Sequence, residues 1–577
     1  MSAADDLRRR INGLLQSDDP LSCDYLGMIA ELVHKKESSG VEWRKYVELL
    51  YEKVRHEIEN NTGRPISPVT FGTSGWRGIL GKDLFCKSVA QVVLAIVEMY
   101  KELDHSAELA GVLGAASLEE VRQRGCVVGY DNRFCGDLLA RVAVQVLDRE
   151  GIKIYFAGET TTGVLSASVL QLDAAFSINF TPSHNPLEYG GLKFNAADGG
   201  PAATEVTRAI TERARGIIGE NRLPLSFAEG SKVPEMPKSI QRIDSLSLWQ
   251  NHLKKNYDAH GLKYAGIIEG FEKKEDLVVV IDSVHGASRL HIDAMFKNTR
   301  SERLIHLRKE KDVTFGGVAP EPSSENMRAV VETLQLRPEK YKLGAIIDPD
   351  GDRIRFTDGN IEINMNQFGA MAYHFLHEYK KKSGLVAKTV ASSNLANAVA
   401  AALGEDVFEP KVGFKEFKPV IGKALVCFEE SDGISIIGHT PEKDAYIGLL
   451  LALDMVLTTG ENLGEYLRQI EETYGFFYPD RDGIAVSLQG EKLLTALAGL
   501  EKYKEGSSVE IEGESRIIDK VIDVDGRKMI FNDGSWLMIR PSGTEPKVRF
   551  YVESRTADGT QDLVKAAKNM LKEIGLL

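Results

Sequence analysis

The sequence predicts a large α/β protein of several domains that ends in a smaller α+β domain. Its 577 residues exceed what one hydrophobic core holds, so roughly three to five domains are expected. Short β-rich runs alternate with helical ones, as in CVVGYD followed by DLLARVAVQVLDREG, a pattern typical of βαβ units with parallel strands. Roughly the last hundred residues contain hairpin-like runs and one closing helix, DLVKAAKNMLKEIG, which indicates an α+β unit.

The composition disfavours several classes of protein. A net charge of -13 argues against a general nucleic-acid binder, because affinity for phosphate backbones comes from clustered Lys and Arg. The five cysteines have no CxxC spacing and indicate neither a disulfide framework nor a thiolate zinc site. The sequence has no signal-peptide core and no apolar run of about 20 residues. We expect a cytoplasmic protein that binds no nucleic acid or membrane; the sequence carries no signal for its oligomeric state.

The predicted elements begin with helices. The runs LGMIAELV and VEWRKYVELLYEKV carry amphipathic stripes before the turn-forming NTGRPISP, so a helical extension precedes the first domain. Strand-like runs that break into polar residues follow: AAFSINF, DLVVVIDSVHGA, KLGAIIDPDGDR, KTVASS and KALVCFEESDG. Open α/β sheets bind ligands at the carboxyl ends of their strands, so the site is expected at these break points.

The segment TPSHNP follows AAFSINF and would lift the Ser183 hydroxyl onto an exposed loop at a strand end. An ordinary Ser/Asn/Pro turn is the alternative. Ser183 and His184 are adjacent, but neighbours on a strand point to opposite faces and no G-x-S-x-G elbow surrounds the serine. These two points disfavour a Ser-His-Asp triad.

The segment DPDGDR places Asp348, Asp350 and Asp352 at alternate positions of a loop that a proline and a glycine tighten. Three hard oxygen donors suit Mg²⁺, with a phosphate as a further ligand. An EF-hand would need Gly and Glu where this chain has Arg353 and Gly359. A solvated acidic turn is the remaining alternative.

Three further loops have the composition of binding sites. RPSGTEPKVR, residues 540–549, brackets two hydroxyls and a glycine with arginines and is able to bind a phosphate; a polar hairpin turn is the alternative. EESD, residues 429–432, offers acceptors to sugar hydroxyls or is an acidic turn. FGTSGWRG, residues 71–78, is glycine-rich, and its amides and Arg77 either face an anion or form a simple turn.

Together and in this order, FGTSGWRG, TPSHNP, DPDGDR, FEESDG and RPSGTEPKVR closely resemble the signature loops of the α-D-phosphohexomutase superfamily, and within it the phosphoglucomutase/phosphomannomutase family. The resemblance runs from about Pro65 to the C-terminus. It implies four domains around a central cleft, three similar α/β domains with mixed sheets and a smaller α+β C-terminal domain. We expect a helical extension over 1–60, domain I with the phosphoserine loop over 61–243, domain II with the metal loop over 244–358, domain III with the sugar loop over 359–477, and domain IV with the phosphate loop over 478–577.

The resemblance also implies the chemistry of the site. Ser183 would be the phosphoserine, and with Asp348, Asp350 and Asp352 would hold Mg²⁺ against the phosphoryl group. Lys193, in GGLKFN, is the candidate general acid or base, with a surface lysine as the alternative. The other implied residues are His184 and Arg77 near the reacting group, and Arg353, Gly413, Glu429, Ser431, Arg540, Ser542, Gly543, Thr544 and Arg549 at the substrate.

The implied reaction moves a phosphoryl group between the 1- and 6-hydroxyls of a hexose phosphate through a bisphosphate, with glucose 1,6-bisphosphate as activator. The Glu-x-Ser of the sugar loop is typical of glucose-type members, whereas glucosamine-type members usually carry Gln before that Ser. Phe428 and Cys135 stand where Gly and Ser often occur, so phosphomannomutase or dual specificity stays open. The alternatives from other classes are an inactive sugar-phosphate-binding protein and a phosphatase.

Overall fold

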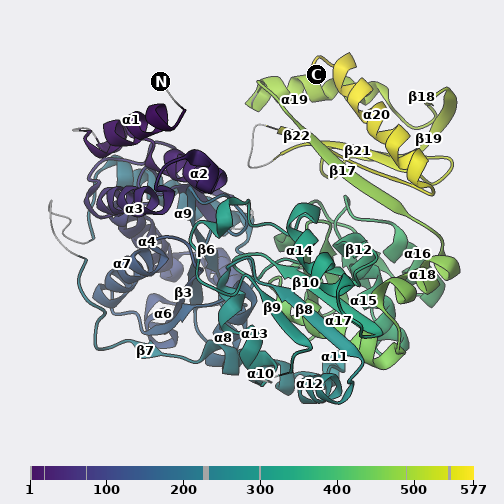
Figure 1. Ribbon diagram of the computed structural model, residues 1–577, viewed down its shortest axis with the longest axis horizontal. Helices are drawn as coiled ribbons and strands as arrows, with labels where there is room; N and C mark the ends of the chain where they lie inside the picture. The colour runs from purple at the N-terminus through teal and green to yellow at the C-terminus, as the bar shows by residue number, and fades with distance from the viewer. Residues whose placement is uncertain are drawn as a thin grey trace.

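The computed structural model describes residues 3–17, 20–72, 75–224, 233–297, 301–488, 490–542 and 547–577. Four sheets follow one another along the chain, with three helices ahead of them (Figure 1). Three of the sheets belong to mixed α/β units and the fourth to a smaller C-terminal α+β unit, so the architecture predicted from the sequence is confirmed. All five cysteines are buried and free.

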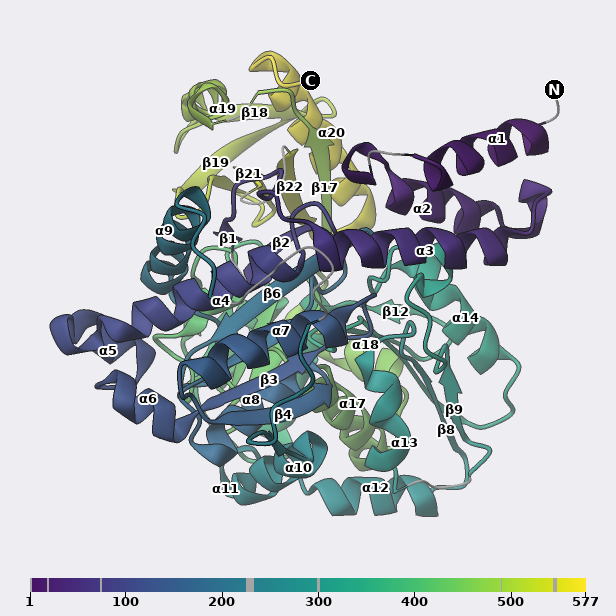
Figure 2. The ribbon, with the colours of Figure 1, turned by 90° about the vertical axis from the view of Figure 1, so that its left-hand side faces the viewer.

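The N-terminal helices are α1 (Ala3–Leu15), α2 (Tyr25–Lys35) and α3 (Trp43–Asn60), with 3-10 turns η1 (Pro20–Ser22) and η2 (Lys36–Ser39) between them. Asp24 caps α2, because its side chain accepts the Gly27 N–H at 2.8 Å. Leu50, Val54 and Ile58 form a buried stripe along α3 at helical spacing. The stripe belongs to the same hydrophobic core as domain I; α3 packs on that domain, and α1 and α2 pack on α3 (Figure 2).

The domain I sheet has the strand order β1-β2-β6-β5-β3-β4-β7. The strands β5, β3, β4 and β7 are parallel, as the βαβ pattern predicts, and β6, β2 and β1 continue the sheet antiparallel. Its elements are β1 (Phe71–Gly72), β2 (Gly75–Ile79), α4 (Cys86–Lys101), η3 (Leu103–His105), α5 (Ala107–Leu113), α6 (Leu118–Arg124), β3 (Cys126–Tyr130), α7 (Gly136–Arg149), β4 (Ile154–Glu159), α8 (Thr162–Leu172), β5 (Phe176–Phe180), β6 (Tyr189–Asn195), α9 (Thr204–Gly219) and β7 (Gln241–Arg242).

The domain II sheet has the order β12-β11-β10-β8-β9, in which β10, β8 and β9 are parallel. Its elements are α10 (Ser245–Lys255), α11 (Tyr257–His260), α12 (Tyr264–Lys273), β8 (Leu277–Asp282), η4 (Ala287–Leu290), α13 (Ile292–Met295), β9 (Leu304–Leu307), η5 (Phe315–Gly317), α14 (Ser324–Gln335), β10 (Tyr341–Ile347), β11 (Ile354–Thr357) and β12 (Glu362–Ile363).

The domain III sheet has the order β14-β13-β15-β16 and shares one hydrophobic core with domain II. Its elements are α15 (Met365–Glu378), β13 (Val386–Lys388), α16 (Leu395–Leu403), β14 (Val407–Phe408), η6 (Phe414–Phe417), β15 (Val426–Glu429), β16 (Gly433–Ile436), α17 (Ala445–Thr459) and α18 (Leu463–Tyr474). Within the described ranges no single helix is long and apolar enough to cross a membrane; only α17 with α18, bent by 79°, reaches that composition as a pair.

Domain IV is an antiparallel sheet of order β17-β22-β21-β20-β19-β18 with a core of its own. Its elements are β17 (Tyr478–Ala485), α19 (Gly490–Ala498), η7 (Gly499–Lys502), β18 (Ser508–Ile511), β19 (Glu514–Ile522), β20 (Arg527–Phe531), β21 (Trp536–Pro541), β22 (Lys547–Ser554) and α20 (Ala557–Glu573). Helix α20 packs against the sheet on the side away from the rest of the molecule (Figure 1).

Each of the three α/β sheets has a loop at an equivalent position. In each, a central parallel strand ends and the chain turns back as an antiparallel neighbour: β5 to β6, β10 to β11, and β15 to β16. We call these connections the serine loop (residues 181–188), the metal loop (348–353) and the sugar loop (429–432, which includes the last residue of β15). All three lie at the carboxyl ends of parallel strands, where α/β sheets bind ligands.

Candidate active site

Ser183 lies in the serine loop with a left-handed backbone (φ 58°), and its N–H donates to Thr181 Oγ1 at 2.8 Å. Its Oγ donates to Asp348 Oδ2 at 2.8 Å and lies 3.3 Å from His184 Nδ1. Two expectations are therefore wrong. The side chain is buried rather than exposed, because the metal loop closes over it. Ser183 and His184 also do not point to opposite faces, since the left-handed turn breaks the alternation of a strand.

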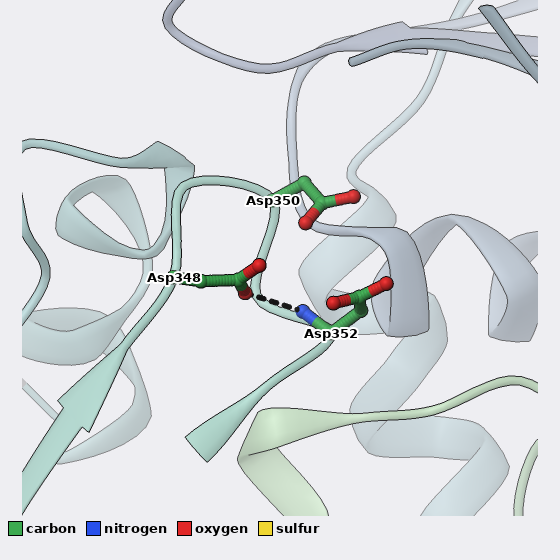
Figure 3. Close-up of side chains that lie close together, drawn as sticks. All are labelled: Asp348, Asp350 and Asp352. Atoms are coloured by element: carbon green, nitrogen blue, oxygen red, sulfur yellow. Dashed lines mark hydrogen bonds between the residues drawn. The ribbon is translucent and has the colours of Figure 1, made fainter. Parts of the chain in front are cut away.

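The metal loop brings three buried carboxyl groups together (Figure 3). Asp348, Asp350 and Asp352 each offer one oxygen, and these atoms lie within 4.8 Å of one another. The N–H groups of Asp352 and Arg353 both donate to Asp348 Oδ1 at 3.0 Å, which fixes the turn. Asp350 Oδ1 is buried and accepts no hydrogen bond from the described residues. Three hard oxygen donors, one of them an unsatisfied buried acceptor, fit a divalent cation such as Mg²⁺.

Lys193, from β6, reaches the same carboxyl groups. Its Nζ lies 2.6 Å from Asp350 Oδ2 and 2.7 Å from Asp352 Oδ2. The side chain is buried, so it is not a surface lysine. Burial lowers the pKa of Lys193, but Asp350 and Asp352 outweigh that effect and the net pKa is raised. Lys193 is therefore charged and neutralises part of the carboxylate cluster.

The carboxyl groups differ in their electrostatics. Burial raises the pKa of Asp348 well above its usual range, and the charges of Asp352 and Asp350 add to the effect. Burial acts in the same direction on Asp352, but Lys193 and Lys443 hold its pKa well below the usual value. The site therefore carries more negative charge at Asp352 than at Asp348.

Domain III contributes a lysine that the sequence reasoning missed. Lys443 Nζ lies 3.1 Å from Glu429 Oε1, at the end of β15, and 3.3 Å from Asp352 Oδ2. Its neighbour Glu442 is buried, which raises the pKa of that carboxyl to about 7. Both residues come from the run HTPEKD, a polar segment between β16 and α17. The charged residues of this run, directly after a buried strand, are the feature of the sequence that could have indicated a place in the site.

The segment that carries Lys443 is fixed by hydrogen bonds to the neighbouring residue, Asp444. His439 Nε2 lies 2.7 Å from Asp444 Oδ2, and Trp249 Nε1 donates to the same oxygen at 2.6 Å. The two adjacent glutamates at the sugar loop point in different directions: Glu429 faces Lys443, whereas Glu430 Oε2 accepts from Thr389 Oγ1 at 2.8 Å. Glu429, rather than Glu430, is thus on the side of the carboxylate cluster.

Basic groups surround the serine loop. Arg353 Nε lies 3.7 Å from Asp352 Oδ1 and is a buried donor without a hydrogen bond to the described residues. Burial and the charge of Arg353 lower the pKa of Arg77, and both also lower the pKa of His184, whose imidazole is therefore neutral. Because the positive charges of Arg77 and Arg353 act on each other, an anion beside them would be stabilised.

The predicted phosphate-binding residues form a separate group on domain IV. Arg540 and Arg549 are paired across β21 and β22, and Arg540 Nε lies 2.9 Å from Asp525 Oδ2. Asp525 also accepts the N–H of Val412, next to Gly413 at the start of η6. The Ser542 N–H donates to the Lys547 carbonyl at 2.8 Å. Ser431, the predicted sugar-binding serine, lies apart from this group, half-buried in the sugar loop of domain III. The predicted residues Gly543 and Thr544 lie outside the described residues.

Comparison with known proteins covers most of the chain. Residues 68–218, 262–361 and 364–474 match the alpha/beta/alpha domains I, II and III of phosphoglucomutase/phosphomannomutase, and residues 488–569 match its C-terminal domain. Phosphoglucomutase 1 of Drosophila melanogaster is 25% identical over 474 residues, which cover 74% of this chain and 83% of that protein. A probable phosphoglucosamine mutase of Methanosphaera stadtmanae is 26% identical over 514 residues, or 88% of this chain and 99% of that protein.

Among solved structures, a putative phosphomannomutase from Thermus thermophilus aligns with a TM-score of 0.67 and 25% identity, over 88% of this chain and 99% of that one. These relatives are named for different hexoses, so they identify a family rather than a sugar. The N-terminal helices precede the first matched residue. With all four domains matched in order, the chain belongs to the phosphoglucomutase/phosphomannomutase family, within the phosphohexomutase superfamily of isomerases.

Proposed function

We propose that this chain is a Mg²⁺-dependent phosphoglucomutase that interconverts glucose 1-phosphate and glucose 6-phosphate through phospho-Ser183. One observation carries the proposal: a buried serine hydroxyl donates at 2.8 Å to a carboxyl group of a cluster that fits a divalent cation. A bound Mg²⁺ would be held by Asp348, Asp350, Asp352 and the group on Ser183, and would neutralise charge on the phosphoryl group. The cytoplasmic location stays a prediction.

The transfer step requires a donor, an acceptor and a proton path. The bond between phosphorus and Ser183 Oγ breaks as a bond forms to the free sugar hydroxyl, which loses its proton while the serine oxygen gains one. Lys193 is the candidate for exchanging that proton, because its charged amine lies within the carboxylate cluster. Arg77, Arg353 and the neutral His184 then face the group in transit.

Substrate holding is assigned to domains III and IV. Glu429 and Ser431 would bind the sugar hydroxyls, with Gly413 beside them, and Lys443 orients Glu429. The non-reacting phosphate would lie among Arg540, Ser542, Gly543, Thr544 and Arg549. After the first transfer the glucose 1,6-bisphosphate would turn over within the site and return its other phosphate to Ser183. Loss of that bisphosphate leaves the serine bare, so a trace of it should activate the enzyme.

Glucose is the favoured sugar because the sugar loop reads Glu-Glu-Ser, and only the first glutamate is turned toward the carboxylate cluster. Phosphomannomutase activity, or dual specificity, is the second candidate, since a putative phosphomannomutase aligns over 88% of the chain.

The test compares glucose 1-phosphate, mannose 1-phosphate and glucosamine 1-phosphate as substrates, with Mg²⁺ and a trace of the matching 1,6-bisphosphate. We expect glucose turnover that Ser183→Ala abolishes. The control Ser168→Ala removes another buried hydroxyl, which donates to the Val164 carbonyl within α8, and should leave turnover intact. Equal mannose turnover would make the enzyme dual in specificity. Net release of inorganic phosphate would support a phosphatase, and binding without turnover of any hexose would support the inactive sugar-phosphate-binding protein.

A further inference from the structure

The N-terminal helices pack against the two segments that lie behind the serine loop. From α3, the ring of Tyr51 packs against that of Phe134 in domain I, with centroids 4.3 Å apart and the ring planes tilted by 34°. From α2, Val33 packs so closely on η5 of domain II that a Cβ at Gly317 would lie 2.9 Å from Val33 Cγ1. The helices thus contact both domains at one junction, α3 at Phe134 and α2 at η5.

Arg133, next to Phe134, occupies that junction. Its guanidinium carbon lies 4.4 Å from the ring centroid of Phe315 in η5, and the side chain is buried. Phe315 belongs to the same hydrophobic core as the N-terminal helices and domain I, although its sequence lies in domain II. The neighbouring Asn132 reinforces the contact, because its side chain donates to the Asp312 carbonyl at 3.2 Å.

The guanidinium group of Arg133 is directed at the serine loop. It donates to the carbonyl oxygens of Ser183 and Pro186 at 2.6 Å each, and also to the carbonyl of Asn185. One buried side chain therefore holds three carbonyls of the loop. A planar group with five fixed donors suits this task, and a lysine could not make the same set of bonds.

The serine loop needs such support. Ser183 adopts a left-handed backbone conformation, which residues with a Cβ rarely adopt and which persists only where the surroundings hold it. Phosphoryl transfer depends on an in-line arrangement, and a misplacement of about 1 Å costs about a hundredfold in rate. A support that fixes the Ser183 backbone therefore acts on the transfer step.

We propose that the N-terminal helices, through Phe134, Phe315 and Arg133, position the serine loop for phosphoryl transfer. Arg133 is a positioning residue: it holds the loop by its carbonyls and takes no part in proton or phosphoryl transfer. The expected effect on the rate of phosphoryl transfer rests on the proposed function of Ser183. The expected ordering of the serine loop by the N-terminal helices does not.

The test uses the full chain with Phe315→Leu, which removes the ring beneath Arg133 and keeps an apolar side chain. The single-turnover rate from phospho-Ser183 to saturating glucose 6-phosphate should fall about tenfold or more. The Kd of glucose 6-phosphate should stay within about twofold, because the substrate contacts are untouched. Phe315→Tyr keeps a ring beneath Arg133, so its single-turnover rate should be close to that of the wild type. The matched control is Phe271→Leu, which removes another fully buried ring lying 4.9 Å from the guanidinium of Arg303 in domain II.

A second pair of variants tests the helices themselves. Tyr51→Leu removes the ring that packs against Phe134 and should slow transfer. Tyr51→Phe should not, because the buried Tyr51 hydroxyl has no hydrogen-bond partner among the described residues. Amide hydrogen exchange of residues 181–188 should be faster in Phe315→Leu and Tyr51→Leu and unchanged in the controls.

Equal slowing by Phe315→Leu and Phe271→Leu, or unchanged exchange of the serine loop in Phe315→Leu, would overturn the proposal. A wild-type protein that transfers no phosphoryl group to any hexose phosphate would instead refute the proposed function. In that case the exchange of the loop still decides whether the helices order it.

Discussion

Lys443 links the carboxylate cluster of domain II to the sugar loop of domain III. Its amine lies about equally far from Asp352 and Glu429, at 3.3 and 3.1 Å. Because the lysine is buried, its charge acts in a medium of low dielectric constant and is worth more than at the surface. One side chain therefore couples the charge of the metal loop to the position of Glu429.

Lys443→Met should lower kcat/KM about a hundredfold, because it removes a preorganised charge from the reacting groups and leaves Glu429 without its partner. Steady-state assays with glucose 1-phosphate measure the effect. Lys380→Met is the control, since it breaks a half-buried ion pair with Asp454 instead. A Lys443→Met enzyme with wild-type kcat/KM would show that the charge has no part in the reaction.

Lys193 would compete with a metal ion at this cluster for the same oxygens, because its amine contacts Asp350 and Asp352. Lys193→Met should therefore bind Mg²⁺ roughly tenfold more tightly, even as turnover falls. Titration calorimetry without sugar measures the Kd directly. Unchanged or weaker Mg²⁺ binding would mean that the lysine does not compete for the cluster. Chelation of the metal should stop turnover in the wild type.

At the scale of secondary-structure elements, domain IV is tied to domain III by a carboxylate at a helix end. Glu553 of β22 accepts the Asn394 N–H at 3.0 Å, at the N-terminus of α16, and also accepts from Trp536 Nε1 at 2.8 Å. A negative charge at this end of a helix is favourable because the helix dipole is positive there.

Glu553→Gln should weaken this docking by about 1 kcal/mol, since the amide loses the charge and turns a donor toward other donors. We expect an earlier calorimetric transition for domain IV and faster proteolysis between α18 and β17. The exposed Glu510→Gln, in β18, serves as control. A single transition at the wild-type temperature would argue that the contact carries no stability.

The loops could be predicted from the sequence better than their surroundings. Ser183 and the three aspartates follow buried strands at recognisable motifs, so their places could be expected from the strand ends. Lys443 and Arg133 could not be assigned, because their contacts with the metal loop and the serine loop depend on how separate segments pack. The burial of Ser183 was missed for the same reason: the loop that covers it comes from another domain.

At the scale of the whole molecule, the three largest hydrophobic cores define three main units. The N-terminal helices share one core with domain I, domains II and III share a second, and domain IV has a third. The contact between the second and third units buries Lys528, whose Nζ donates to the Val390 carbonyl at 2.8 Å and lies 3.9 Å from the Trp536 ring centroid.

Stability should depend on pH through this lysine. Burial lowers the pKa of Lys528 to about 7, with Lys388 acting in the same direction, while Glu409 and Glu553 oppose the shift. From about pH 7 to the ordinary lysine pKa of 10.5, the unfolded chain binds a proton that the folded chain has lost, so stability rises with pH over this window. Below about pH 7 both states are protonated and the dependence ends.

The measurement compares the thermal midpoint of the wild type with that of Lys528→Met across this window. The thermal midpoint of the wild type should rise relative to that of Lys528→Met as the pH rises. Lys565→Met removes an exposed amine, so the difference between its midpoint and that of the wild type should not change with pH. If the thermal midpoints of the wild type and Lys528→Met changed with pH in parallel, Lys528 would not be the cause of the pH dependence.

The equivalent placement of the serine, metal and sugar loops has a consequence for how such a protein changes over evolution. Each loop is the tip of a separate hairpin in its own sheet, and the sugar loop meets the metal-loop hairpin where the Asp432 carbonyl accepts the Ile354 N–H at 2.9 Å. Apart from that contact, side chains of the sugar loop can diverge while the serine and metal loops are retained. Relatives named for glucose, glucosamine and mannose are the outcome expected of a scaffold in which specificity and phosphoryl transfer are inherited as separable parts.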